Sequence, residues 1–286
     1  MSDEQIRLAV LIDADNTSPK RTQEMFDELA RFGPLTVKRA YGDWTGQRLA
    51  GWKDQLLAHA ISPMQQFAYT TGKNSTDSAL IIDAMDLLYA GNVEGFVIVS
   101  SDSDFTRLAT RLRESGKTVY GVGQRKTPRP FQDACDQFIF LELLGTEAPA
   151  TSDARLEDQP EGETEDAAPP AQETLANLQS MLTKALNKTG DDDGWSRVSS
   201  IGSHLTRTSP SFDSRAYGFA KLGDLVQDQP YLETRTTTTS AGGDQLWARL
   251  KGHRPARQEP AGKTGARKTA ARKTTRKAAQ DSDGGV

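Results

Sequence analysis

Between residues 7 and 144, short apolar runs alternate with segments of helical periodicity, and this alternation limits the fold more than any other feature. Strands that alternate with helices form βαβ units, which build a mostly parallel sheet covered by helices on both faces. We therefore predict an α/β domain with a doubly wound sheet over residues 1–145. The expected strands are 8–12, 35–41, 64–68, 95–100, 118–122 and 137–141, and the expected helices are 19–32, 47–60, 76–90 and 104–115.

Charge divides much of the remaining chain into blocks of opposite sign. Residues 146–173 carry nine acidic side chains against one arginine, Arg155, so we predict an acidic disordered linker over 146–172. Residues 251–286 carry ten lysines and arginines, so we predict a basic disordered tail. Such a tail would bind RNA, and DNA without sequence preference, through its charge.

The chain shows no sign of export or of a metal site built on cysteine. No apolar run approaches the roughly 20 residues that span a bilayer, and no secretory signal precedes the first strand, so we expect a cytoplasmic protein without membrane contact. Cys135 is the single cysteine, which excludes a disulfide within the chain and a cysteine-rich zinc site. The three histidines have no ligand spacing, and the sequence gives no expectation for the oligomeric state.

Aspartates follow two of the expected strands and begin one of the helices. Asp13 and Asp15 follow the first strand, Asp102 and Asp104 follow the strand at 95–100, and Asp77 lies in the first turn of the helix at 76–90. Helix capping would explain one polar residue after each strand, so one acid after each strand remains without a structural role. Ligands bind beyond the carboxyl ends of parallel strands, so these carboxylates are expected to meet there. Mg²⁺ or Mn²⁺, which prefer oxygen ligands, would neutralise them and promote phosphodiester hydrolysis.

At these positions the sequence resembles the NYN domain family of PIN-like nucleases, most closely its LabA-like bacterial members. The likeness runs from Arg7 to Leu144. The resemblance implies a PIN-like sheet and a domain that cleaves RNA. It also implies that Mg²⁺ or Mn²⁺ is bound by Asp13, Asp77, Asp102 and Asp104, and that Asn16 positions substrate or water. The motifs that carry it are Ile12 to Asn16, Gly72-Lys73 leading to Asp77, Val99 to Phe105, and Cys135 to Ile139.

The hypothesis is therefore a ribonuclease in which a water activated by the ion attacks the phosphodiester in line. Lys73, Arg107 and Arg125 are candidates for contact with the phosphate because they lie near the acids in sequence.

Two alternatives use the same residues. Asp13 to Thr17 fits the DxDxT signature of haloacid dehalogenase-type phosphohydrolases, in which the first aspartate is the nucleophile. That interpretation leaves Asp77 without a role, and it places the strand-end serine and the later acid pair on one strand. The other alternative is a non-catalytic RNA-binding or scaffold protein whose acids only cap helices or bind metal weakly.

Residues 173–250 have the outline of a winged helix, with three helices followed by a β-hairpin. They resemble the LOTUS domain, also called OST-HTH, through Gly194-Trp195, residues 209–213 and residues 217–225. This resemblance implies RNA capture or recruitment of a protein partner. A small domain needs its aromatic residues inside, so the following are predicted to be core residues: Trp195, Phe212, Tyr217 and Phe219. The candidates for phosphate contact are Arg197, Arg207, Arg215 and Lys221.

Overall fold

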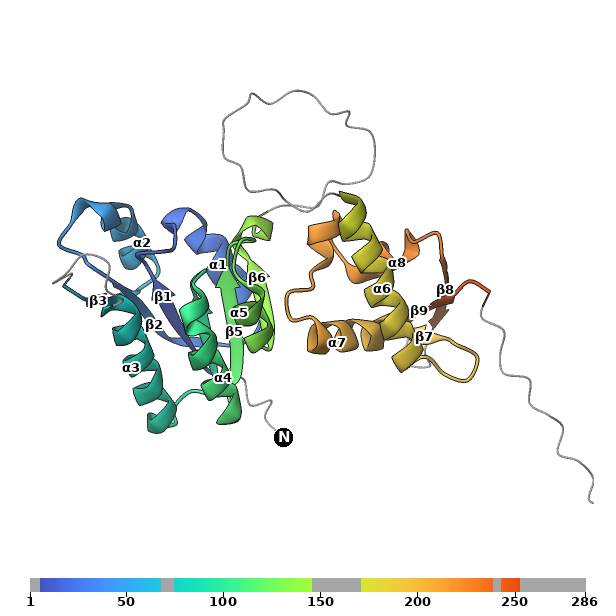
Figure 1. Cartoon of the computed structure of the whole chain (residues 1–286), viewed down its shortest axis with the longest axis horizontal. Coiled ribbons are helices and arrows are strands. Elements are labelled where there is room, and N and C mark those ends of the chain that lie inside the picture. Colours follow the sequence, from blue (N-terminus) through green and yellow to red (C-terminus); the bar gives the residue numbers. More distant parts are fainter. Residues whose placement is uncertain (1–5, 68–74, 146–170, 239–242, 253–286) are drawn as a thin grey trace, which may run out of the picture. The chain divides into compact units, whose positions relative to one another are not determined.

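The computed structural model describes residues 6–67, 75–145, 171–238 and 243–252, which form two β-sheets, each with its own helices (Figure 1). The predicted acidic linker and almost all of the predicted basic tail lie outside the described residues, as does Lys73. Among the helices that are described, none combines the length and the apolar character that crossing a bilayer requires.

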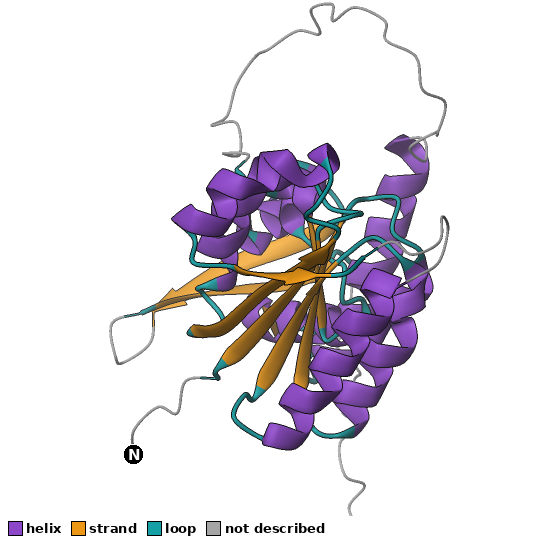
Figure 2. Ribbon diagram, turned by 90° about the vertical axis from the view of Figure 1, so that its left-hand side faces the viewer, coloured by secondary structure: helices purple, strands orange, loops and turns teal. Residues whose placement is uncertain are grey.

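The larger sheet has six strands, all parallel, and confirms the predicted doubly wound α/β fold. Its order is β3-β2-β1-β4-β5-β6, so the direction of winding reverses between β1 and β4. The strands fan out with the usual twist of such sheets (Figure 2). Their bounds are β1 Leu8–Asp13, β2 Leu35–Gly42, β3 Ser62–Gln65, β4 Gly95–Val99, β5 Thr118–Gly123 and β6 Gln137–Phe140.

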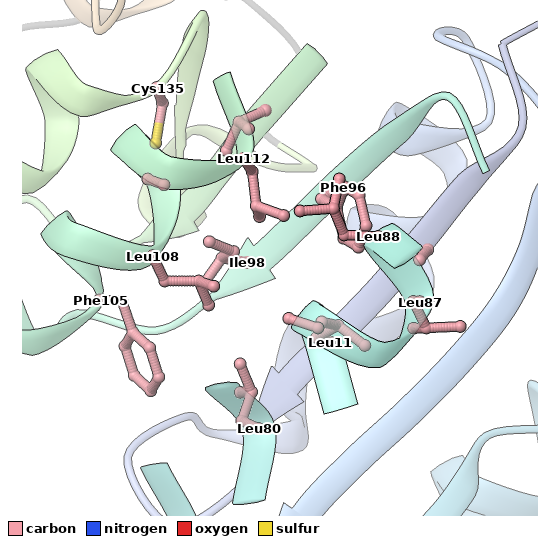
Figure 3. Close-up of a cluster of buried hydrophobic side chains, with 14 of the residues drawn as sticks. Leu11, Leu80, Leu87, Leu88, Phe96, Ile98, Phe105, Leu108, Leu112 and Cys135 are labelled. Atoms are coloured by element: carbon pink, nitrogen blue, oxygen red, sulfur yellow. The ribbon is translucent and has the colours of Figure 1, made fainter. Parts of the chain in front are cut away.

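Helices cover both faces of this sheet, which explains why β1 is apolar from Leu8 to Ile12 and why β4 carries no polar side chain. On one face, Leu11 and Ile98 pack with Leu80 and Leu108 from α3 and α4 (Figure 3). On the other face, strand residues such as Val10 and Ile12 pack with α1 and with the 3₁₀ helix that precedes α2. The helices are α1 Thr22–Leu29, α2 Lys53–Ala58, α3 Ser75–Ala90, α4 Thr106–Glu114 and α5 Arg129–Ala134, with short 3₁₀ helices at Pro19–Arg21, Gln47–Trp52, Ser103–Phe105 and Leu141–Leu143.

Three local predictions differ from the structure. The strand predicted at 64–68 is β3, which runs from Ser62 to Gln65. It lies at the edge of the sheet, and its bounds are set by pairing with β2, which begins with Ser62 beside Arg39. The predicted helix at 47–60 begins as a 3₁₀ helix and becomes α-helical at Lys53. Helix α5 was not predicted, since it is short and a proline stands just before it and another inside it.

The smaller sheet is antiparallel, with the order β7-β9-β8, and its inner face carries the second core. Buried Leu182, Ile201, Leu225 and Ala248 lie in that core. This α+β arrangement confirms the predicted small domain. Its elements are α6 Ala171–Thr189, β7 Ser196–Arg197, α7 Val198–Thr208, α8 Leu222–Gln227, β8 Leu232–Thr238 and β9 Asp244–Leu250, with a 3₁₀ helix at Ser214–Tyr217.

The aromatic residues of this domain divide between its two sides. Phe212, Tyr217 and Phe219 pack against the core as predicted. The prediction for Trp195 was wrong, because Trp195 is half-buried and lies outside that core. Ser196 is turned inward with 1% of its surface exposed, and successive residues of an extended chain point to opposite faces, so Trp195 lies on the outer side.

Candidate functional site

The candidate site lies where the winding of the larger sheet reverses. β1 and β4 are neighbours there, and Ile12 of β1 is paired with Val99 of β4. Asp13 is the last residue of β1 and Ser100 directly follows β4, so both lie at the carboxyl edge of the sheet. This is the position at which doubly wound sheets bind ligands.

Asp13 is fully buried, and its orientation is fixed by two side chains. Its Oδ2 accepts hydrogen bonds from the Ser100 hydroxyl at 2.8 Å and from the Asn16 side-chain amide at 2.9 Å. Burial raises the pKa of the Asp13 carboxyl, and the hydrogen bonds from Asn16 and Ser100 oppose that rise. Asn16, expected to position substrate or water, here orients this carboxylate.

Ser100 connects the two acidic segments, and it was not among the predicted site residues of the nuclease. Its side chain is 1% exposed; the hydroxyl donates to Asp13 and accepts the Asp102 backbone N–H at 3.1 Å. Asp102 in turn caps the following 3₁₀ helix by accepting the Asp104 N–H at 2.9 Å. Capping thus accounts for one acid of this pair, as expected, and Asp104 is the other.

Three carboxylates converge beside this network. Asp77, Asp102 and Asp104 each offer an oxygen, and these oxygens lie within 4.8 Å of one another. Asp77 comes from the first turn of α3, and Asp102 and Asp104 from the loop after β4. The structure therefore brings together acids that lie on two separate segments of the chain.

Burial and the charges of neighbouring acids both act on Asp77. It is 8% exposed, and its pKa is raised to about 6, first by burial and then by the negative charges of its acidic neighbours. Asp13 is the largest contributor among those charges, although it is not one of the three clustered carboxylates. Burial and the neighbouring negative charges thus both favour the protonated form of Asp77.

The donor set fits a hard divalent cation. Three carboxylates within reach of one ion are ligands that Mg²⁺ and Mn²⁺ prefer, whereas zinc sites are usually built with histidine or cysteine. A cation would also relieve the repulsion that raises the pKa of Asp77.

Asp15 belongs to the same edge but was not among the predicted ligands. Its Oδ2 accepts the Thr76 hydroxyl at 2.8 Å, which links the loop after β1 to the start of α3, next to Asp77. The Asp-x-Asp spacing after β1 was the signal for it. Its negative charge adds to the rise in the pKa of Asp77.

The predicted phosphate contacts are less defined. Arg107 lies in the first turn of α4, and Arg125 lies in the loop after β5, where its backbone N–H donates to Glu142. Both side chains are exposed, and within the described part of the chain neither is bonded to the acids. Lys73 lies outside the described residues.

In the smaller domain, the structure separates the predicted basic candidates. Arg215 is half-buried and forms an ion pair with Asp213 at 2.7 Å, so its charge is already compensated. Arg207 and Lys221 are exposed. Arg197 is exposed and lies against the Trp247 ring, at 5.1 Å from its centroid.

Comparison with known families identifies both parts of the chain. Residues 7–142 match the NYN domain model, which covers every acid of the site described above. Residues 173–242 match the OST-HTH/LOTUS domain model. The chain combines an NYN domain with an OST-HTH/LOTUS domain. The NYN domain is a nuclease-like fold, and the LOTUS domain is associated with RNA binding.

Individual relatives are distant. An uncharacterized protein of Methanocaldococcus jannaschii is 26% identical over 121 residues, which is 41% of this chain and 47% of that protein. The chain thus spans about half the length of that curated relative. A crystal structure of a Vibrio parahaemolyticus protein of unknown function is 20% identical, with a TM-score of 0.43, over 49% of this chain and 95% of that one. A solution structure from Chromobacterium violaceum is 27% identical, with a TM-score of 0.23, over 30% of this chain and 91% of that one.

Proposed function

We propose that this protein is a ribonuclease that depends on Mg²⁺ or Mn²⁺ and hydrolyses RNA phosphodiester bonds at the edge between β1 and β4. The observation that carries the proposal is the convergence of Asp77, Asp102 and Asp104 within 4.8 Å in an NYN domain. This domain match favours the nuclease over the haloacid dehalogenase-type phosphohydrolase, which also leaves Asp77 without a role.

The three clustered carboxylates would hold the cation, with Asp13 adding negative charge beside them. A bound divalent ion supplies positive charge that lowers the pKa of a water and offsets the charge that develops on the phosphate. Ser100 and Asn16 keep the Asp13 carboxylate in one orientation.

Part of the site is accessible to solvent. Asp13 and Asp77 are buried, whereas Asp104 and Asn16 are exposed. Acids that are fixed on the inner side and accessible on the outer side allow an RNA strand to lie across the site. Lys73, Arg107 and Arg125 are the basic residues that we propose for the phosphate, and the LOTUS domain and the basic tail would recruit the RNA.

The test is cleavage of end-labelled single-stranded and hairpin RNA in Mn²⁺, Mg²⁺ or EDTA. The intact chain is compared with Asp77→Asn and Asp102→Asn, which keep side-chain size and remove one charge each. Asp86→Asn is the matched control, because Asp86 is an exposed acid on the same helix as Asp77. We expect cleavage that requires the cation, a loss of at least about 100-fold in both site variants, and little change in the control.

Two other results would replace the proposal. RNA binding without cleavage in any metal would make the chain a non-catalytic RNA-binding protein. Phosphate release from small phosphoesters, with RNA left intact, would instead favour the phosphohydrolase.

A further inference from the structure

The outer face of the small sheet carries tryptophans and arginines. Ala248 of β9 and Leu232 of β8 are buried on the inner face, so their neighbours in sequence point outward. The outward residues that interact there are Trp195 and Arg197 at β7, Glu233 and Arg235 of β8, and Trp247 and Arg249 of β9.

Strand pairing places these side chains side by side. Trp247 of β9 is paired with Arg197 on one side and with Arg235 on the other. The Arg235 guanidinium lies 4.1 Å from the centroid of the Trp195 ring and 5.5 Å from that of Trp247. Arg249 lies 4.7 Å from the Trp195 centroid. The result is a layered group of flat cations and indole rings, which we call the Trp–Arg face.

The core does not account for this arrangement. A small domain gains most by burying its aromatic residues, yet Trp195 and Trp247 are both half-buried and lie outside the core cluster. The Trp247 indole N–H donates to the Thr237 hydroxyl at 2.9 Å, which fixes the ring on the outer face. Two tryptophans are thus held at the surface in a defined orientation.

The charge of the face is positive. Three of its side chains are arginines and one is an acid, Glu233, which forms an ion pair with Arg249 at 2.7 Å. Asp191 lies beside the face, where its carboxylate accepts the Trp195 backbone N–H at 2.7 Å. Arg197 and Arg235 are exposed. The sequence that continues from β9 adds further lysines and arginines, beginning with Lys251. An occupant with negative charge and flat rings would complement both features of the surface.

We propose that the Trp–Arg face binds single-stranded RNA by base stacking. Aromatic rings and arginine planes stack on unpaired bases, and each stacked base contributes about 1–3 kcal/mol by alanine substitution. The same guanidinium groups donate to phosphate oxygens. This inference rests on the proposed recruitment of RNA by the LOTUS domain and names the surface and the form of RNA that it takes.

The test measures binding of the full-length protein to a labelled single-stranded RNA of about 12 nucleotides, a length within the range of small single-strand sites. EDTA prevents cleavage that depends on a cation, and about 0.2 M salt weakens binding through charge alone. Fluorescence anisotropy compares the intact chain with Arg235→Ala, Trp247→Ala and Trp247→Phe. Lys184→Ala is the matched control, because it removes one exposed positive charge from α6, which packs against the opposite side of the sheet.

We expect Arg235→Ala and Trp247→Ala to weaken binding roughly 5- to 100-fold, the loss of about one stacked base. Trp247→Phe should retain most of the affinity, since it keeps an aromatic ring. Lys184→Ala should bind like the intact chain. Arg235 is exposed, so its variant tests the inference even if Trp247→Ala fails to fold.

An abasic oligonucleotide of equal length separates stacking from charge. The intact chain should bind it more weakly than the RNA, and the Trp247→Ala substitution should then have little further effect. Equal losses on both ligands would overturn the inference, because charge alone would explain them. RNA binding that is unchanged in both alanine variants would also overturn it and would leave the face as a stabilising feature of the sheet.

Cleavage is measured separately, so the two proposals can fail independently. Weakened binding in the Trp–Arg variants without RNA cleavage by the intact chain would support the face and contradict the nuclease. RNA cleavage by the intact chain, with RNA binding unchanged in the Trp–Arg variants, would support the nuclease and contradict the face.

Discussion

At the scale of single residues, Ser100 is the least conspicuous part of the site and the one that connects it. Its hydroxyl holds Asp13 and receives the Asp102 N–H, so one oxygen sets the positions of two acidic segments. We predict that Ser100→Ala leaves the chain folded, reduces RNA cleavage about 10-fold or more, and raises the cation concentration needed for half-maximal rate, because a lost buried hydrogen bond costs about 1–3 kcal/mol. Cleavage assays across a Mn²⁺ titration measure both changes, and a variant with unchanged rate and unchanged cation dependence would remove Ser100 from the site.

Asp77 gives a second prediction, on stability without metal. Its pKa is raised to about 6 in the folded chain, so the folded state binds this proton more tightly than the unfolded state. Stability from this group is therefore present below about pH 4 and is lost as the pH rises to about 6, by at most about 3 kcal/mol. Asp77→Asn should lack this loss and be more stable than the intact chain at pH 7 in EDTA.

Urea unfolding at pH 4, 6 and 7, with Asp86→Asn as the control, tests this prediction. Adding Mn²⁺ should stabilise the intact chain and reverse the order of the two proteins. If Asp77→Asn proved less stable than the intact chain in EDTA at pH 7, carboxylate repulsion would not dominate this site.

The sequence predicted much at this scale and missed what depends on three-dimensional contacts. The meeting of Asp77 with Asp102 and Asp104 followed from their places at strand and helix ends, which a parallel sheet brings to one edge. Ser100 was missed because a serine after a strand has no periodicity that marks its partner. Trp195 was misplaced because β7 has two residues, too few to show the alternation that turns its neighbour outward.

At the scale of elements, β5 supports the site by passing very close to the end of β4. A Cβ on Gly123 would lie 2.6 Å from the Ser100 backbone oxygen, which cannot move without shifting β4. Gly123→Ala should therefore destabilise the chain by about 1–3 kcal/mol and reduce cleavage as well. Gly46→Ala is the control, because a Cβ there meets a neighbouring atom at 4.0 Å and the residue has a φ of −92°. Urea unfolding measures the free energy of unfolding of both variants. Equal values would show that β5 can shift to accommodate the added Cβ.

Element order was predictable, and element ends were less so. The order of strands and helices in the larger sheet followed from apolar periodicity. The bounds of β3 depended on pairing with β2, which is a long-range contact that local periodicity does not contain. Prolines at 128 and 130 concealed α5, although proline is well tolerated in the first turn of a helix.

At the scale of the whole molecule, the basic segment after β9 should govern how RNA binding responds to salt. Truncation after Gly252 removes the basic residues beyond Lys251, and fewer released counterions mean a shallower fall of log affinity with log salt. Truncation after Ala278 is the control, since it removes two acids and no basic residue. Binding measured from about 0.05 to 0.2 M salt gives both slopes. A slope unchanged by the longer truncation would assign the electrostatic binding to the folded domains.

The order in which the chain is synthesised determines when the site can be complete. Asp13 and Ser100 are 87 residues apart, and their hydrogen bond requires β1 and β4 to be neighbours. A nascent chain leaves the ribosome with β1 before β4 is synthesised, so Asp13 emerges before its partner Ser100 and before the three clustered carboxylates. The hydrolysis that we propose needs Asp77, Asp102 and Asp104 together, so an emerging chain cannot carry it out before Asp104 has been synthesised. The length of chain between β1 and β4 thus sets how late in synthesis the proposed site is complete.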